Sequence, residues 1–204
     1  VVVDAERGSV LDSQVLDQID RLDAHLEALP NVGKAVSVAD PLRQLHASFG
    51  NEGVPEGTAL AEQYLLLLES VAQLEDLIAD DRTHANILLR LDNNGSSQIL
   101  EVAREAERWW AAEGVSDSSV RATGVMFEFA RAQDAIAWGQ IVGLGAALVS
   151  IAFVLLATFR TPIAAAITVV PNVVPLLGIY GAMGFLGVPL DAGTVLVGSL
   201  AIGI

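Results

Sequence analysis

Few residues of this chain could carry out chemistry, and those few do not form a catalytic or metal-binding pattern. His25, His46 and His84 are scattered, with neither an HExxH motif nor a second ligand at metal-site spacing. Cysteine is absent, which excludes thiolate nucleophiles and disulfides. The chain also lacks a GxSxG motif and a Walker loop. We therefore expect no enzyme activity, no cofactor and no bound metal, with solvated or hydrogen-bonded histidines.

Arg160 and Asp191 are the only charged residues in the stretch 135–204. Asp191 follows a Gly-Val-Pro break at the entrance to an apolar segment, where a carboxylate can reach water or cap a helix. We therefore do not assign it a proton-relay role. Arg160 lies in a short turn between two apolar segments, and short loops that carry Lys or Arg tend to be cytoplasmic. This orientation places residues 1–134 outside the cytoplasm.

The stretch 135–204 is predicted to be embedded in a membrane, because it has no polar face that could meet water. Its breaks at Thr161-Pro162 and at Gly187-Val188-Pro189 predict three helices, at about 135–159, 162–186 and 192–204. The last would be truncated at Ile204. A start without Met inside a predicted strand, and an end inside a predicted helix, indicate a fragment of a longer polytopic protein.

The predicted membrane helices contain small and helix-bending residues at regular spacing. Small residues four apart let another helix approach closely, and prolines free backbone carbonyls that only protein or a hydrated cavity can satisfy. The alternative to such a role is that these prolines are present only because proline is more frequent in membrane helices than in soluble ones. The residues expected to serve helix packing or gating are Gly139, Gly143, Pro171, Asn172, Pro175 and Gly178.

Residues 1–134 carry the whole formal net charge of −14 and are numerous enough for one folded domain. A strongly acidic domain argues against nucleic-acid binding, since neutralising phosphates requires clustered Lys and Arg. Beyond that, the acidic surface needs no explanation other than keeping the domain soluble.

Apolar periodicity predicts alternating strands and helices in this acidic part. Steps of four and three mark helices, with Asp17, Asp20, Asp23 and Glu27 on the polar side of the first, and alternation marks strands. The predicted elements are strands at 1–3, 32–38, 85–91 and 119–125 and helices at 15–29, 60–78 and 97–113. This order predicts an α+β, ferredoxin-like split βαβ domain with a helical insertion at about 41–82. Trp109 and Trp110 are expected in a core or interface, with an apolar ligand between them as the alternative.

These features together resemble the resistance-nodulation-division (RND) transporters. The resemblance rests on the domain order, on the turn Phe159-Arg160-Thr161-Pro162, and on two later stretches, Gly187-Val188-Pro189-Leu190-Asp191 and Ser199-Leu200-Ala201-Ile202-Gly203-Ile204. The chain is most similar to the MMPL-like exporters, whose membrane part is similar to the sterol-sensing domain.

The resemblance implies an extracytoplasmic porter-type domain followed by helices in the cell inner membrane. It implies proton-driven export of lipids or other hydrophobic substrates, with the bilayer and the substrate as partners. The proton-relay acids would come just after Ile204, outside the fragment. The alternative is a non-transporting sensor or receptor with an extracytoplasmic ligand-binding domain. Substrate identity and oligomeric state, a homo-oligomer included, are not readable from the sequence.

Overall fold

The computed structural model describes residues 1–68, 74–93 and 95–186. It divides into two compact units, Val1–Glu128 and Phe129–Ile204, and the boundary falls within one long helix. The predicted domain boundary after residue 134 lies in the same helix and stays a prediction.

The first unit is built around short antiparallel strands, β1 (Val2–Ala5), β2 (Val32–Val36), β3 (His84–Asn86), β4 (Leu88–Leu91) and β5 (Ser118–Arg121). One sheet has the order β3-β1-β5, and the other pairs β2 with β4. Only Ile87 separates β3 from β4, and Ile87 exchanges two backbone hydrogen bonds with Val1, of 2.7 and 2.9 Å. The segment 84–91 therefore pairs with β1 through its first half and with β2 through its second half.

This strand arrangement agrees with the predicted α+β domain. The segment 84–91 separates β1 from β2, and β1 separates that segment from β5. Each β-α-β unit is thus split by a strand of the other, as in a split βαβ sheet. Side chains alternate as they should in strands with one covered face: Val3, Ala85 and Ile87 are fully buried, and Asp4 and His84 lie on the other face.

Two long helices, α1 (Ser13–Glu27) and α5 (Ser96–Glu113), pack on the strands and contribute apolar side chains to the core. Both packed helices agree with the periodicity of the sequence to within two residues. The predicted stripe on α1 is confirmed, because its four helical members are all buried: Val15, Ile19, Leu22 and Leu26. α1 packs on β2 and on α5.

The insertion contains α2 (Ala39–Ser48), α3 (Thr58–Leu68) and the short α4 (Leu74–Leu77). The prediction of a strand running to Val38 was wrong at its end, because β2 ends at Val36 and α2 begins at Ala39. Ser37 and Asp40 form a capping box: the Ser37 N–H donates to Asp40 Oδ2 at 3.1 Å, and the Ala39 N–H donates to Ser37 Oγ at 3.1 Å. Pro41 in the first turn is also compatible with a helix start.

The predicted helix 60–78 is only partly correct. α3 ends at Leu68, α4 begins at Leu74, and Val71 lies outside the described residues. The steps of four and three that predicted this helix include Tyr64 and Ile78, which are buried as expected, but also Leu67, which is 60% exposed while Leu65 is buried instead. Four consecutive leucines at 65–68 give no unique apolar face, so periodicity could not identify the buried one.

The turn after α5 depends on a glycine. A Cβ on Gly114 would lie 2.6 Å from both Cδ1 and Nε1 of Trp110 and would also meet the Trp110 carbonyl. Trp110 is 4% exposed, so its ring has little room to move. We expect Gly114→Ala to destabilise the first unit by about 1–3 kcal/mol, as overpacking does. Urea-dependent proteolysis of the whole chain measures this loss. Gly124→Ala does not serve as a control because its φ is +113°. Gly33→Ala should cost less, because its closest contact would be the flexible Asp92 carboxylate and the Arg90 carbonyl lies at an ordinary 3.6 Å.

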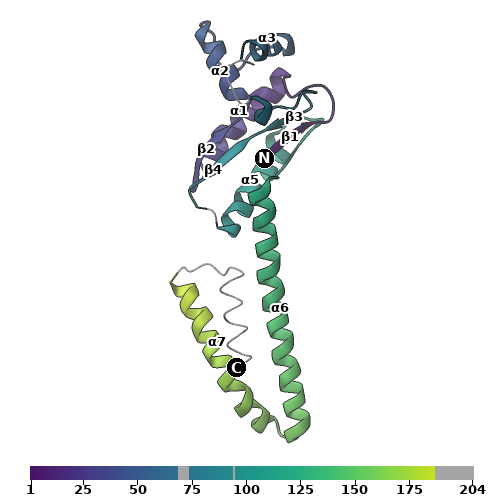
Figure 1. Ribbon diagram of the computed structural model, residues 1–204, viewed down its shortest axis with the longest axis vertical. Helices are drawn as coiled ribbons and strands as arrows, with labels where there is room; N and C mark the ends of the chain where they lie inside the picture. Colours follow the sequence, from purple (N-terminus) through teal and green to yellow (C-terminus); the bar gives the residue numbers. More distant parts are fainter. Residues whose placement is uncertain (69–73, 94, 187–204) are drawn as a thin grey trace. The chain divides into compact units, whose positions relative to one another are not determined.

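The second unit contains most of α6 (Val125–Phe159) and all of α7 (Pro162–Phe185), drawn in green and yellow-green in Figure 1. Within the described residues, α6 is long and apolar enough to cross a membrane, with a mean hydropathy of 2.5 in its most apolar window. At about 1.5 Å per residue, α6 exceeds the roughly 30 Å hydrocarbon layer, consistent with a crossing confined to 135–159. The predicted third helix, 192–204, lies outside the described residues.

The turn between α6 and α7 follows from three residues. Arg160 has a left-handed backbone (φ +56°) and its N–H donates to the Leu156 carbonyl at 2.9 Å, which ends α6. Thr161 is extended, as a residue before proline must be, and Pro162 opens α7.

Candidate functional site

The residues that the sequence suggested for helix packing or gating all lie on α6 and α7. Gly139 and Gly143 lie one turn apart on α6, and Pro171, Asn172, Pro175 and Gly178 lie on α7, which remains helical through both prolines. Apart from the backbone of its own helix and its chain neighbours, no described heavy atom lies within 4 Å of where a Cβ would stand on Gly139, Gly143 or Gly178. The structure therefore brings no partner against these glycines among the described residues, and their role stays a prediction.

The three histidines each have a protein partner. His25 Nε2 lies 3.1 Å from Glu105 Oε1, His46 Nδ1 lies 3.2 Å from the Tyr64 hydroxyl, and His84 Nδ1 lies 2.6 Å from Asp4 Oδ1. In the described parts of the chain, no three His, Asp or Glu side chains are grouped so as to hold a metal ion. This arrangement matches the expectation of partner-satisfied histidines.

The two tryptophans at the end of α5 are used for packing. Trp110 is buried, and its Nε1–H donates to Ser118 Oγ at 3.2 Å. The Trp109 ring stacks on His25, with ring centroids 5.8 Å apart and an interplanar angle of 29°. The two indoles tilt toward one another at 51° with centroids 6.2 Å apart, an ordinary aromatic pair.

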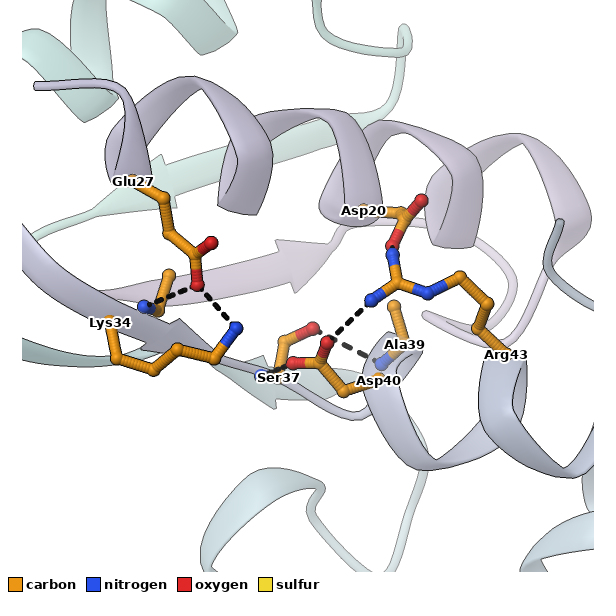
Figure 2. A network of polar contacts seen from close by, with 8 residues as sticks. Asp20, Glu27, Lys34, Ser37, Ala39, Asp40 and Arg43 are labelled. Carbon is orange, nitrogen blue, oxygen red and sulfur yellow. Dashed lines mark hydrogen bonds and ion pairs between the residues drawn. The ribbon is translucent and has the colours of Figure 1, made fainter.

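A network of charges joins α1 to the β2–α2 turn, and Figure 2 shows its members. We call it the α1–α2 polar network and define it as Asp20, Glu27, Lys34, Ser37, Asp40 and Arg43. Arg43 forms ion pairs with Asp20 on α1 and, at 2.7 Å, with Asp40 on α2. Glu27 accepts from Lys34 and from the Ala35 N–H at 3.0 Å. The network therefore ties α2 and β2 to α1.

The carboxylates of this network differ in their environment. Burial raises the pKa of Asp20, and the Arg43 guanidinium opposes that rise. The hydrogen bond from Lys34 is the main cause that lowers the pKa of the exposed Glu27, and the same contact raises the pKa of Lys34. Both exposed partners are screened by water, so this pair adds little to stability.

Asp23 is the unusual member of α1. It is only 6% exposed, although the sequence suggested that it belongs to the polar side of the helix, and this prediction was wrong. Neither carboxylate oxygen has a hydrogen-bond partner in the described structure. The pKa of Asp23 is raised to about 7: burial is the largest cause, the Ser37 side chain opposes it, and the nearby Asp40, Asp20 and Glu27 add to the rise. Ser37 thus lies close enough to influence the ionised carboxylate without forming a hydrogen bond of ordinary geometry.

The sequence contained a signal for this burial. Asp23 follows Ile19 by four residues and precedes Leu26 by three, so it lies at the edge of the apolar stripe. The other acids of the helix, Asp17, Asp20 and Glu27, nevertheless suggested that Asp23 belongs to the polar face. The Ser37–Asp40 pair was a further signal, but only for where α2 begins along the chain.

An apolar cavity of about 350 Å³ opens within the first unit, where β4, α5 and the first turn of α6 meet. No Asp, Glu, Lys or Arg side chain lines it. Its walls include Leu89, Leu91, Ile99, Val102, Ala103, Met126 and Phe127. A site of this size and composition suits the hydrocarbon part of a ligand. Periodicity could not predict the cavity, because it shows which residues are apolar but not where their packing is incomplete.

Comparison with protein families matches residues 1–199 to the MMPL family. This chain belongs to the MMPL family. Members of this family are membrane-embedded transporters, so the resemblance to RND-type exporters is confirmed at the level of the family. Comparisons with curated proteins and with solved structures gave no match.

Membership in the MMPL family gives the two units their context. A transporter needs a membrane-crossing part, and α6 of this MMPL chain meets the requirement in length and hydropathy. The apolar cavity and the α1–α2 polar network both lie within the first unit, whose residues bear the whole acidic excess.

Proposed function

We propose that this MMPL chain is part of a proton-driven exporter of lipids or other hydrophobic substrates in the cell inner membrane. Residues 1–134 form the extracytoplasmic porter-type domain, and the helices of 135–204 cross the bilayer. The family match supports transport, and the division of the chain into an acidic domain and an almost uncharged stretch supports this topology.

Within this proposal, the helices of 135–204 pack and bend during transport, whereas the residues that bind the protons lie outside this stretch. The acids of the proton relay come just after Ile204, while Gly139, Gly143, Pro171, Asn172, Pro175 and Gly178 let neighbouring helices pack closely and bend. Small residues and prolines are what such contacts require. A buried carboxylate costs roughly 3 kcal/mol at the centre of a membrane helix on insertion scales, so it is retained only for function.

The apolar cavity is the observation that carries the choice of substrate. Its uncharged lining includes residues at the start of α6, so an apolar surface extends from the cavity to the helix that enters the membrane. We propose that the hydrocarbon part of the substrate occupies this cavity during export. Burying apolar surface contributes roughly 25 cal/mol per Å², which is sufficient to hold a chain without polar contacts.

Two alanines on α5 provide a matched test of this role. Ala103 is buried and lines the cavity, whereas Ala106, one turn along, is fully buried and does not line it. We expect Ala103→Phe to fill the cavity with little loss of stability and to abolish most export. Ala106→Phe should instead cost about 1–3 kcal/mol, because its ring would enter a packed core. Export by the complete protein and urea-dependent proteolysis of both variants measure the two effects.

The outcomes separate transport from sensing. Loss of export in a stable Ala103→Phe protein supports the exporter, and normal export contradicts substrate binding in the cavity. If neutralising the acids after Ile204 left export unchanged, proton coupling through that segment would be ruled out. A complete protein that exports nothing would favour the sensor instead.

A further inference from the structure

Asp23 is a buried acid for which the family and the proposed transport path provide no use. Its side chain is 94% inaccessible, and neither oxygen accepts a hydrogen bond in the described structure. An unpaired ion in such a place is costly, whereas a neutral carboxylic acid is tolerated. The geometry therefore favours the protonated form as long as the site stays buried.

Charged groups face Asp23 from several elements, and most carry the wrong sign to stabilise an ionised carboxylate. On α1 itself are Asp20 and Glu27, and on α2 is Asp40. The nearby cations are already engaged, because Arg43 binds Asp20 and Asp40 while Lys34 binds Glu27. The amino group of Val1, just before β1, also interacts with Asp23, and it donates a hydrogen bond to the Ile87 carbonyl at 2.9 Å.

α5 also packs on α1, and two of its charged groups contact other residues of α1. Glu105 contacts His25 at 3.1 Å, and Glu113 lies 3.9 Å from Arg21. Neither is among the groups that influence Asp23. The Ser37 hydroxyl, fully buried at the start of α2, is therefore the neutral group best placed to respond to its ionisation.

We propose that Asp23 is a proton-binding site that couples the acidity around the first unit to the docking of α2 on α1. With the proton bound, the neutral acid stays buried and Arg43 holds α2 against α1. When the proton leaves to solvent, the charge faces Asp20, Glu27 and Asp40 without a free cation. Separation of the β2–α2 turn from α1 then lets water reach the carboxylate.

The movement of α2 would extend into the insertion. His46 on α2 contacts the Tyr64 hydroxyl on α3, and Phe49, at the end of α2, stacks on Tyr64 with ring centroids 5.7 Å apart. α2 and α3 therefore respond together. The proposal concerns the first unit alone and does not depend on the identity of the exported substrate.

Hydrogen exchange on the full chain in lipid nanodiscs tests this proposal. We expect exchange in α2, divided by the intrinsic rate at each pH, to rise roughly tenfold or more from about pH 5.5 to about pH 8. Exchange in α5, corrected in the same way, should not rise with pH. Asp23→Asn should keep α2 protected at both values of pH, because the amide is as neutral as the protonated acid. Asp23→Ser is a second neutral variant, with the same expectation, in case the amide disturbs the buried site.

Asp17→Asn is the matched control, because Asp17 lies on the exposed face of the same helix. It removes one negative charge without changing the buried site, so the pH response should persist. Protection of α2 that does not change with pH in the wild type would overturn the proposal. So would a response that persists in both neutral Asp23 variants, or one that Asp17→Asn abolishes as fully as Asp23→Asn does.

Discussion

At about pH 8, the Asp23→Asn protein is expected to exceed the wild type in stability by on the order of 4 kcal/mol, the equivalent of a shift of about three pKa units. The cause is burial, which raises the pKa of Asp23 from 3.8 to about 7 in the folded state. Asparagine has nearly the same shape, and like the protonated acid it offers one acceptor oxygen and a donor. It therefore keeps the packing while removing the cost of burying a charge.

The sign of this effect depends on pH. Below the unfolded pKa of 3.8, both states of the wild type hold the proton, and the substitution should change little. As pH rises from 3.8 to about 7, the unfolded chain releases its proton and the folded chain does not, so wild-type stability falls. Above about 7 the difference is constant. The Asn variant should therefore lack the decline in stability that the wild type shows across this window.

Urea-dependent pulse proteolysis of the complete chain in detergent, repeated from about pH 4 to about pH 8, measures both curves. Asp17→Asn serves as the control, because an exposed acid should leave the wild-type decline in place. An Asn variant that is less stable than the wild type at the high-pH end would mean that the ionised carboxylate has a favourable partner after all.

Elements with one clear apolar face were predictable from the sequence. The steps of four and three in α1 and α5, and the alternation in 84–91, each match a single secondary structure and a single buried face. The part of α6 at 135–159 was predictable as a helix for a different reason, since a run of this length without charges favours a membrane-spanning helix, although α6 itself begins earlier, at Val125. In α1, α5 and 84–91 the local pattern and the tertiary environment agree.

Elements whose local pattern allowed two answers were not predictable. α2 follows β2 so closely that Val36 and Val38 continued the strand pattern, and only the capping box of Ser37 and Asp40 indicated the helix. In α3 the run of four leucines fits several faces, so Leu67 was assigned to the core although it is exposed. Contacts with the rest of the unit decide both cases.

The candidate sites show the same division. The apolar composition of the membrane helices, with Gly139 and Gly143 among their small residues, is visible in sequence, but their packing partners are not. Asp23 is buried where α1 meets other elements of the first unit, among them the β2–α2 turn with Ser37, and no property of α1 alone reveals this. The cavity depends on where three elements fail to fill the space between them. Sequence thus supplies the chemical groups, and tertiary packing supplies their environment.

Trp110→Ala is expected to destabilise the first unit by about 3–5 kcal/mol, the range for removing a large buried aromatic side chain. Trp110 is 4% exposed, belongs to the main core, and donates its Nε1–H to Ser118 Oγ at 3.2 Å. Ser118 Oγ in turn donates to the Val115 carbonyl at 2.6 Å, which secures the turn before β5. The substitution therefore leaves a cavity in the core and removes a contact between α5 and β5.

Two further variants separate the contributions of Trp110. Trp110→Phe keeps most of the packing but loses the hydrogen bond, so it should cost roughly 1–2 kcal/mol. Trp138→Ala is the control, because Trp138 lies on α6 outside the first unit and is 67% exposed. Proteolysis of the first unit within the complete chain ranks the three proteins. Equal losses for Trp110→Ala and Trp110→Phe would show that the hydrogen bond to Ser118, rather than the buried ring, holds α5 against β5.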